Sequence, residues 1–524
     1  MLRSLRRLRK PGIEEALMRF QRASGILLHP SSLPGRFGIG DLGGEAYKFI
    51  DFLSASGQRL WQILPLGPPG YGNSPYQSYS AFAGNTLLVS PERLVKDGLL
   101  SEDDLAGAPE FPGKRIDFAR VIEFKRTILE KAFDNFTRTE DLRLGEEFET
   151  FLRYAAAWLD DYALFAALKD EHNGAVWNSW EPGLASREAK AIARARERLR
   201  ERIEAHEFFQ YLFFKQWLEL KRYANQKEIK IIGDMPIFVA HNSADVWSHP
   251  DLFKLDGRGN PTSVAGVPPD LFSKTGQLWG NPVYNWDRFR EMGFRWWIER
   301  VRETLRTVDL VRIDHFRGFV ATWEVPGGEK TAERGKWVGV PGRELFNAMR
   351  NALGDLAVLA EDLGTITPDV IALREELGLP GMRVLQFAFG GDPRDTHLPH
   401  NYDHNTVVYT GTHDNDTTVG WFRAAPGKNS TQDADQIKRE RERCMKYLNT
   451  DGSEINWDFI RAALSSVADL AIIPLQDVLG LDSSARMNVP ASEEGNWGWR
   501  YEEGALDEAP SRRLKEMSEL YARK

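Results

Sequence analysis

Eight short apolar runs recur along the chain, and this pattern constrains the fold more than any other feature of the sequence. Each run has the length and the continuous apolar character of a strand that is buried on both faces. The predicted strands cover residues 24–30, 59–66, 229–239, 308–316, 356–363, 382–389, 405–414 and 470–480. Amphipathic patterns typical of helices lie between many of them. Strand followed by helix, repeated eight times, predicts an α/β fold, a (β/α)₈ TIM barrel.

One connection is much longer than a barrel crossover requires. Residues 67–228 separate the second and third predicted strands, with a turn-rich start and then long charged, helical stretches. We therefore expect a large, mainly helical insertion there. The expected organisation is an N-terminal extension (1–23), barrel strands 1 and 2 (24–66), inserted subdomains and substrate loops (67–228), barrel strands 3 to 8 (229–505) and a C-terminal helix (506–524).

The composition is that of a globular protein, with 42% hydrophobic and 27% charged residues. A formal net charge of −8 predicts no attraction to nucleic acid or to an anionic membrane, so a neutral or small ligand is expected. The single cysteine, Cys444, is compatible with a reducing cytosol. The basic residues 1–10 could be mistaken for a targeting segment, but Pro11 follows without an apolar stretch. We expect a cytoplasmic protein that spans no membrane.

Acidic residues stand near the ends of three predicted strands: Asp314, Glu361 and Asp414. In a parallel barrel the carboxyl ends of all strands meet at one face, so these side chains can converge on one ligand. Two carboxyl groups are the minimum equipment for breaking a glycosidic bond. The sequence therefore favours an enzyme that acts on sugars.

The neighbours of these acids suggest their roles. Arg312 and Asp314 are two positions apart, so on a strand they point to one face, and the guanidinium would keep the carboxylate ionised as a nucleophile requires. A structural salt bridge is the alternative interpretation. His413 and Asp414 offer a donor and an anion that can bind adjacent sugar hydroxyls and stabilise an oxocarbenium ion.

Glu361 and Asp362 are neighbours, so only one of them can face the cavity of an extended strand. Glutamate has the longer reach, and apolar walls would give it the raised pKa that a proton donor needs. We therefore favour Glu361 as the general acid and keep Asp362 as the alternative.

Aromatic side chains supply flat faces on which a pyranose ring can stack. Four of them stand in segments that favour loops: Tyr71, Tyr76, Trp279 and Phe272. The alternative is that they belong to the core. The segment 265–280 could cover the site as a loop and exclude water while an acceptor sugar waits.

The motifs, in their order and with their flanking sequence, resemble the α-amylase clan and most closely its 4-α-glucanotransferase family, called amylomaltase or disproportionating enzyme. The resemblance extends from about Ser24 to Tyr501. It is carried by HPSSLPGRFGIGDLG, ILPLGPPGYGNSPYQSYSAFAGN, GDMPIFVAHNSADVW, AGVPPDLFSKTGQLWGNPVYNW, VRIDHFRG, AEDLG, GTHDNDT and GNWGWR.

The resemblance implies a role for each acid. Asp314 would be the nucleophile that forms a β-linked glycosyl-enzyme, Glu361 the general acid and then base, and Asp414 the transition-state stabiliser. The substrates would be malto-oligosaccharides and α-1,4-glucans. The resemblance also implies no metal and no organic cofactor.

Further residues match the sugar-binding positions of the family. By similarity, Arg312 and His413 would be accessory residues in the donor sugar pocket. Asp234 would be the clan's aspartate near the end of the third strand, with a structural or sugar-binding task.

The chain departs from the family pattern in two places. The family commonly carries an aromatic pair where this chain has Asp270-Leu271-Phe272, so a stacking surface on the acceptor side and the chain-length preference are in question. Near the C-terminus the family has Asn-x-Pro-Gly-Thr, whereas residues 488–492 are Asn-Val-Pro-Ala-Ser. Ala491 enters the left-handed backbone region less readily than glycine, so the loop that bears the substrate-binding candidate Asn488 is expected to run differently.

Transfer and hydrolysis share their first chemical step, and the acceptor held in place decides between them. The preference for transfer over a retaining α-glucan hydrolase therefore comes from the resemblance.

A catalytically silent glucan-binding protein is disfavoured because all three acids are present. A phosphate-binding aldolase would need a glycine-rich cradle and a lysine at a strand end, which the strand ends lack. The sequence sets no oligomeric state.

Overall fold

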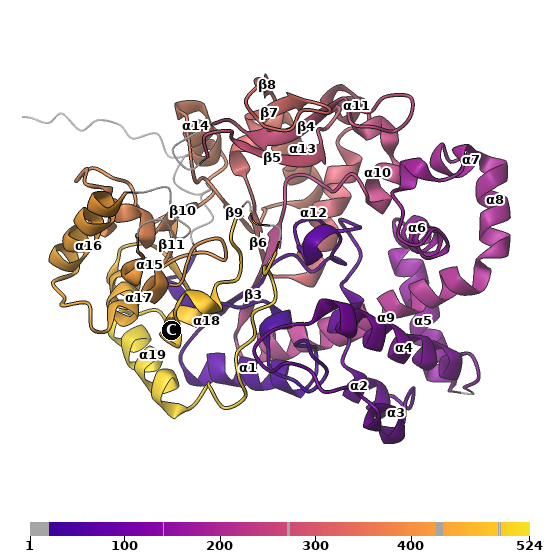
Figure 1. Ribbon diagram of the computed structural model, residues 1–524, viewed down its shortest axis with the longest axis horizontal. Coiled ribbons are helices and arrows are strands. Elements are labelled where there is room, and N and C mark those ends of the chain that lie inside the picture. Colours follow the sequence, from indigo (N-terminus) through magenta and orange to yellow (C-terminus); the bar gives the residue numbers. More distant parts are fainter. Residues whose placement is uncertain (1–19, 140, 270–272, 426–432, 491, 493) are drawn as a thin grey trace, which may run out of the picture.

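In the computed structural model, described for residues 20–139, 141–269, 273–425, 433–490, 492 and 494–524, eight parallel strands form the central sheet (Figure 1). Their order is β10-β11-β12-β1-β2-β3-β6-β9. The strands are β1 (Ala23–Leu27), β2 (Leu60–Gln62), β3 (Lys230–Met235), β6 (Leu310–Ile313), β9 (Val358–Ala360), β10 (Gly381–Val384), β11 (Thr406–Tyr409) and β12 (Leu470–Pro474). Each overlaps one predicted run, so the barrel prediction is confirmed. The observed strands are shorter, because the chain leaves the sheet at its carboxyl ends to build loops.

The sheet is nearly closed into a barrel. Its two outermost strands, β9 and β10, approach each other where the Ala360 amide donates to the Pro380 carbonyl oxygen at 3.0 Å. Every residue of β2, β6, β9, β11 and β12 is buried. Strands covered on both faces can be apolar throughout, which explains why the sequence runs do not alternate.

Helices surround the barrel and build the expected insertion. The helices outside the insertion are α1 (Gly44–Ala55), α10 (Ala244–Ser248), α11 (Trp286–Glu291), α12 (Arg295–Thr307), α13 (Gly342–Leu353), α14 (Pro368–Glu376), α15 (Thr418–Arg423), α16 (Ala434–Leu448), α17 (Ile455–Ser465), α18 (Leu475–Val478) and α19 (Glu508–Leu520). None of the helices in the described part of the chain has the length and apolar character needed to cross a membrane.

The insertion between β2 and β3 lies to one side of the barrel (Figure 1). It contains α2 (Pro91–Lys96), α3 (Glu102–Ala106), α4 (Phe118–Phe136), α5 (Leu142–Ala155), α6 (Leu159–Glu171), α7 (Pro182–Ala185), α8 (Ala189–Arg198) and α9 (Arg200–Gln226). Helix α9 joins the insertion to the barrel. Phe208 in its first half stacks on Phe136 of α4, and Trp217 in its second half packs on Trp61 of β2.

A second sheet covers part of the barrel face. Its four strands are antiparallel in the order β5-β4-β7-β8, namely β5 (Gln277–Pro282), β4 (Ser263–Val267), β7 (Ala321–Pro326) and β8 (Lys336–Gly339). Residues 265–280, expected from the sequence to form a loop, instead contribute to β4 and β5 of this sheet. The strands are short and contain glycine and proline, so they lack the periodicity by which a strand is recognised.

Candidate active site

A buried arginine organises one side of the site at the carboxyl ends of β3 and β6. Arg312, only 4% exposed, donates from Nη2 to Oδ1 of Asp314 at 2.8 Å. Its Nη1 lies 2.7 and 2.6 Å from the two carboxylate oxygens of Asp234. Asp234 and Arg312 are register partners in adjacent strands, so the sheet itself brings them together. One guanidinium therefore holds two carboxylates.

Burial and charge act in opposite directions on this cluster. Burial lowers the pKa of Arg312, but Asp234 and Asp314 outweigh it and raise the pKa well above its ordinary value. Burial raises the pKa of Asp234, although Arg312 opposes this effect. The Asp314 side chain is 30% exposed. It therefore combines a permanently charged partner with access to a ligand.

Glu361 lies beside this pair, directly after β9. Its Oε2 accepts from the His315 amide at 2.7 Å and its Oε1 from the Leu363 amide at 2.8 Å. Burial, and next the nearby Asp314, raise the pKa of Glu361 to about 8. The side chain is therefore protonated at neutral pH, as a general acid must be. His315 adopts a left-handed conformation (φ 55°), an uncommon geometry for a residue other than glycine and one that clusters at active sites.

Asp362 belongs to the barrel wall. Its Oδ1 accepts from the Met382 amide at 2.6 Å, and its Oδ2 lies 3.5 Å from both Arg374 and Arg383. These partners stand on β10 and α14. Of the two neighbouring acids, Glu361 is thus the one whose charge couples to Asp314.

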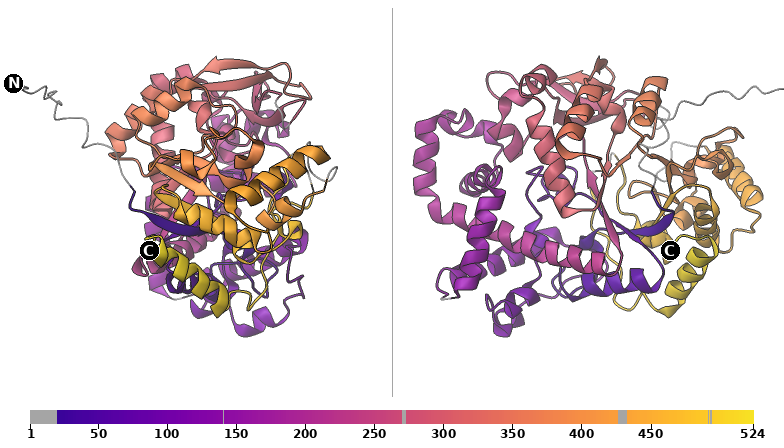
Figure 2. Two further views of the ribbon diagram at one scale, coloured as in Figure 1. Left: turned by 90° about the vertical axis from the view of Figure 1, so that its left-hand side faces the viewer. Right: turned by 180° about the vertical axis from the view of Figure 1, so that it is seen from behind.

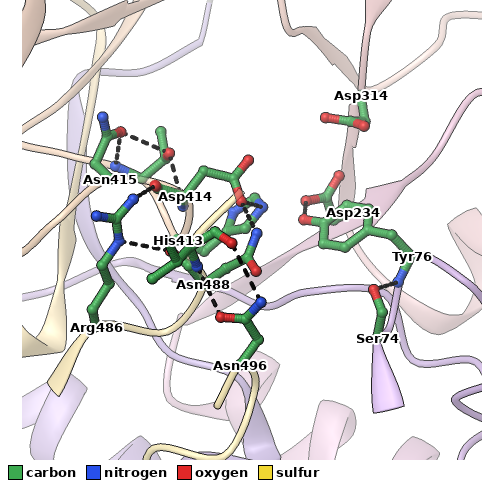
Figure 3. A network of polar contacts seen from close by, with 12 residues as sticks. Ser74, Tyr76, Asp234, Asp314, His413, Asp414, Asn415, Arg486, Asn488 and Asn496 are labelled. Atoms are coloured by element: carbon green, nitrogen blue, oxygen red, sulfur yellow. Dashed lines mark hydrogen bonds and ion pairs between the residues drawn. The ribbon is translucent and has the colours of Figure 1, made fainter. Parts of the chain in front are cut away.

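Asp414 approaches the site from the other side (Figure 3). Its Oδ1 accepts from Asn488 Nδ2 at 2.6 Å and lies 3.4 Å from His413 Nε2. Arg486 donates from Nη2 to the backbone carbonyl oxygen of Asp414 at 2.7 Å. The backbone amide of Asn488 donates to the backbone carbonyl oxygen of His413 at 3.1 Å. The segment after β12 therefore holds both residues. Figure 3 shows Asp314 and Asp414 on opposite sides of the group of side chains that it draws.

Tyr76 links the two sides of the site. Its hydroxyl donates to Asp234 Oδ2 at 2.7 Å, and its ring stacks on His413 with centroids 5.1 Å apart and planes at 16°. Burial, and next Asp234, raise the pKa of Tyr76 well above its ordinary value, so the hydroxyl remains a donor.

The other aromatic candidates occupy different positions. Trp279 in β5 meets the His315 ring edge-to-face at 4.8 Å and thus lies beside the site. Tyr71 begins the turn Tyr71–Asn73 and is 73% exposed. Phe272 lies outside the described residues.

The sequence analysis missed two contributors, Arg486 and Trp497. The backbone of Trp497 is in the left-handed region (φ 64°), and its ring packs on both Tyr76 and His413. Trp497 belongs to the segment GNWGWR, which contributes to the family resemblance. The segment alone does not indicate which of its two tryptophan rings points toward the site. Arg486 carried no signal in the sequence. Among the described residues, no group of three or more His, Cys, Asp or Glu is placed to hold a metal ion.

Comparison with known proteins gives consistent matches over nearly the whole chain. A family model described as 4-alpha-glucanotransferase matches residues 28–506. The chain is 51% identical over 508 residues to a 4-alpha-glucanotransferase of Synechocystis sp., covering 96% of this chain and 98% of the relative. It is 48% identical over 514 residues to one of Thermus thermophilus, covering 97% and 100%.

Solved structures agree with these relatives. An amylomaltase from Streptococcus agalactiae, in complex with acarbose, matches with a TM-score of 0.91 and 41% identity, covering 96% of this chain and 100% of that one. An amylomaltase from Corynebacterium glutamicum matches with a TM-score of 0.78 at 18% identity, covering 95% and 75%, which shows a common fold.

Proposed function

The chain belongs to the 4-alpha-glucanotransferase family and transfers α-1,4-glucan segments between malto-oligosaccharides. We propose that it does so by a retaining double displacement. The observation that carries the proposal is a pair of nearby carboxyl groups in different surroundings. Arg312 forms an ion pair with Asp314 at 2.8 Å, whereas burial raises the pKa of Glu361 to about 8. An ionised nucleophile beside a protonated acid is the requirement of this mechanism.

In the first step, a carboxylate oxygen of Asp314 attacks the anomeric carbon of the donor glucan. The bond from that carbon to the glycosidic oxygen breaks, and Glu361 gives its proton to the departing oxygen. The products are a covalent glycosyl-enzyme and a released glucan whose 4-hydroxyl is free. Asp414 and His413 bind hydroxyls of the reacting sugar and stabilise the oxocarbenium-like transition state between them.

In the second step, the 4-hydroxyl of an acceptor glucan attacks the same carbon. Glu361, now a carboxylate, takes the hydroxyl proton, and the bond to Asp314 breaks. Two inversions restore the α configuration. Tyr76, Trp279 and Asn488 are proposed to bind sugar rings on either side of the bond. The acarbose complex of the Streptococcus agalactiae relative supports an oligosaccharide as the ligand of this site.

We also propose a cytoplasmic location. The single cysteine, Cys444, is buried and needs no disulfide partner, which is compatible with a reducing compartment.

Product analysis from maltotriose tests the activity. We expect maltopentaose and longer glucans to appear together with glucose, and proton NMR of early products to show the α anomer. A retaining hydrolase would give glucose and maltose alone, and β-anomeric products would contradict a double displacement.

The nucleophile can be identified chemically. We predict that Asp314→Asn lowers kcat by a factor on the order of 10⁴ while the thermal unfolding curve stays close to that of the wild type. With α-maltosyl fluoride, whose leaving group needs no proton, the Glu361→Gln variant should accumulate an intermediate that mass spectrometry places on the peptide containing Asp314. Asp309→Asn at the opposite end of β6 is the matched control and should remain active. An adduct on another residue would contradict the assignment.

A further inference from the structure

Residues 410–418 run from the end of β11 to the first residue of α15 and carry His413 and Asp414. We call them the 410–418 loop. A transition-state stabiliser acts only if it is held in place before the reaction, so whatever fixes this loop is part of the catalytic apparatus.

One buried carboxylate binds both ends of the loop. Oδ2 of Asp477, in α18, accepts from the Thr410 hydroxyl at 2.5 Å and from the Thr418 hydroxyl at 2.8 Å. Its Oδ1 accepts from the Thr418 amide at 2.7 Å. The residue is 1% exposed. The first and last residues of the loop are thus fixed to a single side chain.

The burial of Asp477 has an energetic cost that its hydrogen bonds must offset. Within the described residues, Asp477 forms no ion pair with an arginine, lysine or histidine, and its partners are neutral hydroxyl and amide groups. Burial, together with the nearby Asp416, raises the pKa of Asp477 against the effect of these hydrogen bonds. An isolated buried carboxyl group is unfavourable unless it is well hydrogen-bonded. Here it accepts three bonds.

The packing around the loop is incomplete. A cavity of about 30 Å³ adjoins it, and His29, Thr412, Thr417 and Gln476 are among the residues that line this cavity. Among the described residues, His29 Nδ1 is buried there without a hydrogen-bond partner. Because a cavity lining lacks contacts on one side, the polar attachments contribute to where the loop stands.

We propose that Asp477 is a positioning residue that fixes the 410–418 loop and thereby places Asp414 for transition-state stabilisation. Asp477 holds the base of the loop, while Arg486 and Asn488 hold its tip. All three follow β12, so one stretch of chain fixes the loop at both levels. The inference rests on the proposed role of Asp414.

A double-mutant cycle on acarbose affinity tests this coupling. Acarbose carries a flattened first ring, so it reports complementarity to the transition state more than maltotriose does. We expect Asp477→Asn to weaken acarbose binding by about 10- to 100-fold and to lower kcat similarly, with KM for maltotriose changed by less than about 3-fold. In an Asp414→Asn background, the same substitution should have almost no further effect on acarbose affinity.

A more conservative substitution controls for the possibility that Asp477→Asn acts by general misfolding. Thr410→Val keeps the shape of the side chain but removes its donor, so it should show the same selective loss, whereas Thr410→Ser, which keeps the hydroxyl, should restore acarbose affinity. Asp309→Asn controls for a carboxyl-to-amide change elsewhere and should leave that affinity unchanged.

Two outcomes would overturn the inference in distinguishable ways. If Asp414→Asn weakens acarbose binding but Asp477→Asn reduces it by the same factor in both backgrounds, Asp477 does not act through Asp414, and the proposed function stands. If Asp414→Asn leaves kcat and acarbose affinity intact, the proposed role of Asp414 fails, and the positioning role of Asp477 fails with it.

Discussion

At the scale of single residues, the site depends on the different surroundings of two nearby carboxyl groups, Asp314 and Glu361. Arg312 binds Asp314 directly, whereas Glu361 receives two backbone amides but sits where burial dominates. The same residue chemistry therefore serves attack in one position and proton donation in the other. This division predicts how both activity and stability respond to pH.

The raised pKa of Glu361 makes the folded state less stable as the pH rises. Its pKa changes from 4.5 to about 8 on folding, so the folded state binds the proton more tightly. The stabilising effect is complete below about pH 4.5 and is lost as the pH rises through about 8. At about 1.4 kcal/mol per pKa unit, the full effect is on the order of a few kcal/mol.

We therefore predict that Glu361→Gln unfolds at a higher temperature than the wild type, by a margin that grows from pH 5 to pH 8. Thermal unfolding of both proteins across that range measures it. Glu123→Gln on the exposed surface of α4 is the control. A margin that does not change with pH would show that Glu361 is not the titrating group. The kcat/KM of the wild type should fall above about pH 8, where the acid loses its proton.

The sequence places three acids at strand ends, but it distinguishes neighbouring acids only by the length of their side chains. Strand ends meet at one face of a barrel, so Asp314, Glu361 and Asp414 could be picked from position alone. The preference for Glu361 over the adjacent Asp362 depends on side-chain length alone, because the partners of both residues come from distant segments. Arg374 and Arg383, which bind Asp362, are part of no motif. Contacts of this kind exist only once the barrel has closed.

At the scale of elements, α9 fixes the segment that contains Gly84 and Ser90 and follows Tyr76 in the chain. The side chain of Gln210 accepts from the Gly84 amide at 2.7 Å and donates to the Gly84 carbonyl oxygen at 3.0 Å. Gln216 binds the backbone of Ser90 in the same two-way manner, at 2.7 and 3.3 Å. All four groups are buried. The helix thus replaces the backbone partners that this irregular segment lacks.

We predict that Gln210→Leu lowers the free energy of unfolding by about 2–3 kcal/mol, because it leaves a buried amide and a buried carbonyl without partners. Urea unfolding measures this loss. Gln226→Leu, at the exposed end of the same helix, should change the free energy by less than about 0.5 kcal/mol. Equal effects of the two substitutions would mean that the Gly84 contact contributes nothing.

Elements were predictable to different degrees. The eight barrel strands are continuous apolar runs because helices and loops cover both faces, and such runs stand out in a sequence. The β5-β4-β7-β8 sheet does not stand out, since its strands are stabilised by pairing between segments far apart in the chain, such as β4 with β7. The division of the chain into domains stays a prediction.

At the scale of the whole molecule, a buried arginine, Arg523, and a partly buried one, Arg22, join the last residues of the chain to the barrel. Arg523 is fully buried and donates to the carbonyl oxygens of Ala23, Ala463, Leu464, Ser466, Ala468 and Asp469. Arg22 donates to those of Leu464, Ala468 and Tyr521. Figure 2 shows the C-terminus beside β1. These bonds tie α19 to the amino ends of β1 and β12.

We predict that Arg523→Ala destabilises the protein by about 3–5 kcal/mol, because it leaves several buried carbonyl groups without donors and opens a cavity. The measurement is the midpoint and slope of urea unfolding. Lys524→Ala, which removes an exposed ion pair with Glu519, should have little effect. An unchanged midpoint for Arg523→Ala would show that water can replace the guanidinium.

The four-stranded sheet is assembled from two antiparallel strand pairs, β4–β5 after β3 and β7–β8 after β6. The two pairs are joined by hydrogen bonds between β4 and β7. The pairing of β4 with β7 thereby closes a ring of chain that includes β5 and β6, the strand that presents Asp314. Residues 327 and 328, between β7 and β8, are exposed and lie outside that ring. New termini introduced there by circular permutation would leave the ring intact. Termini between Asp314 and Ala321 would instead cut the ring and remove this constraint on the position of Asp314.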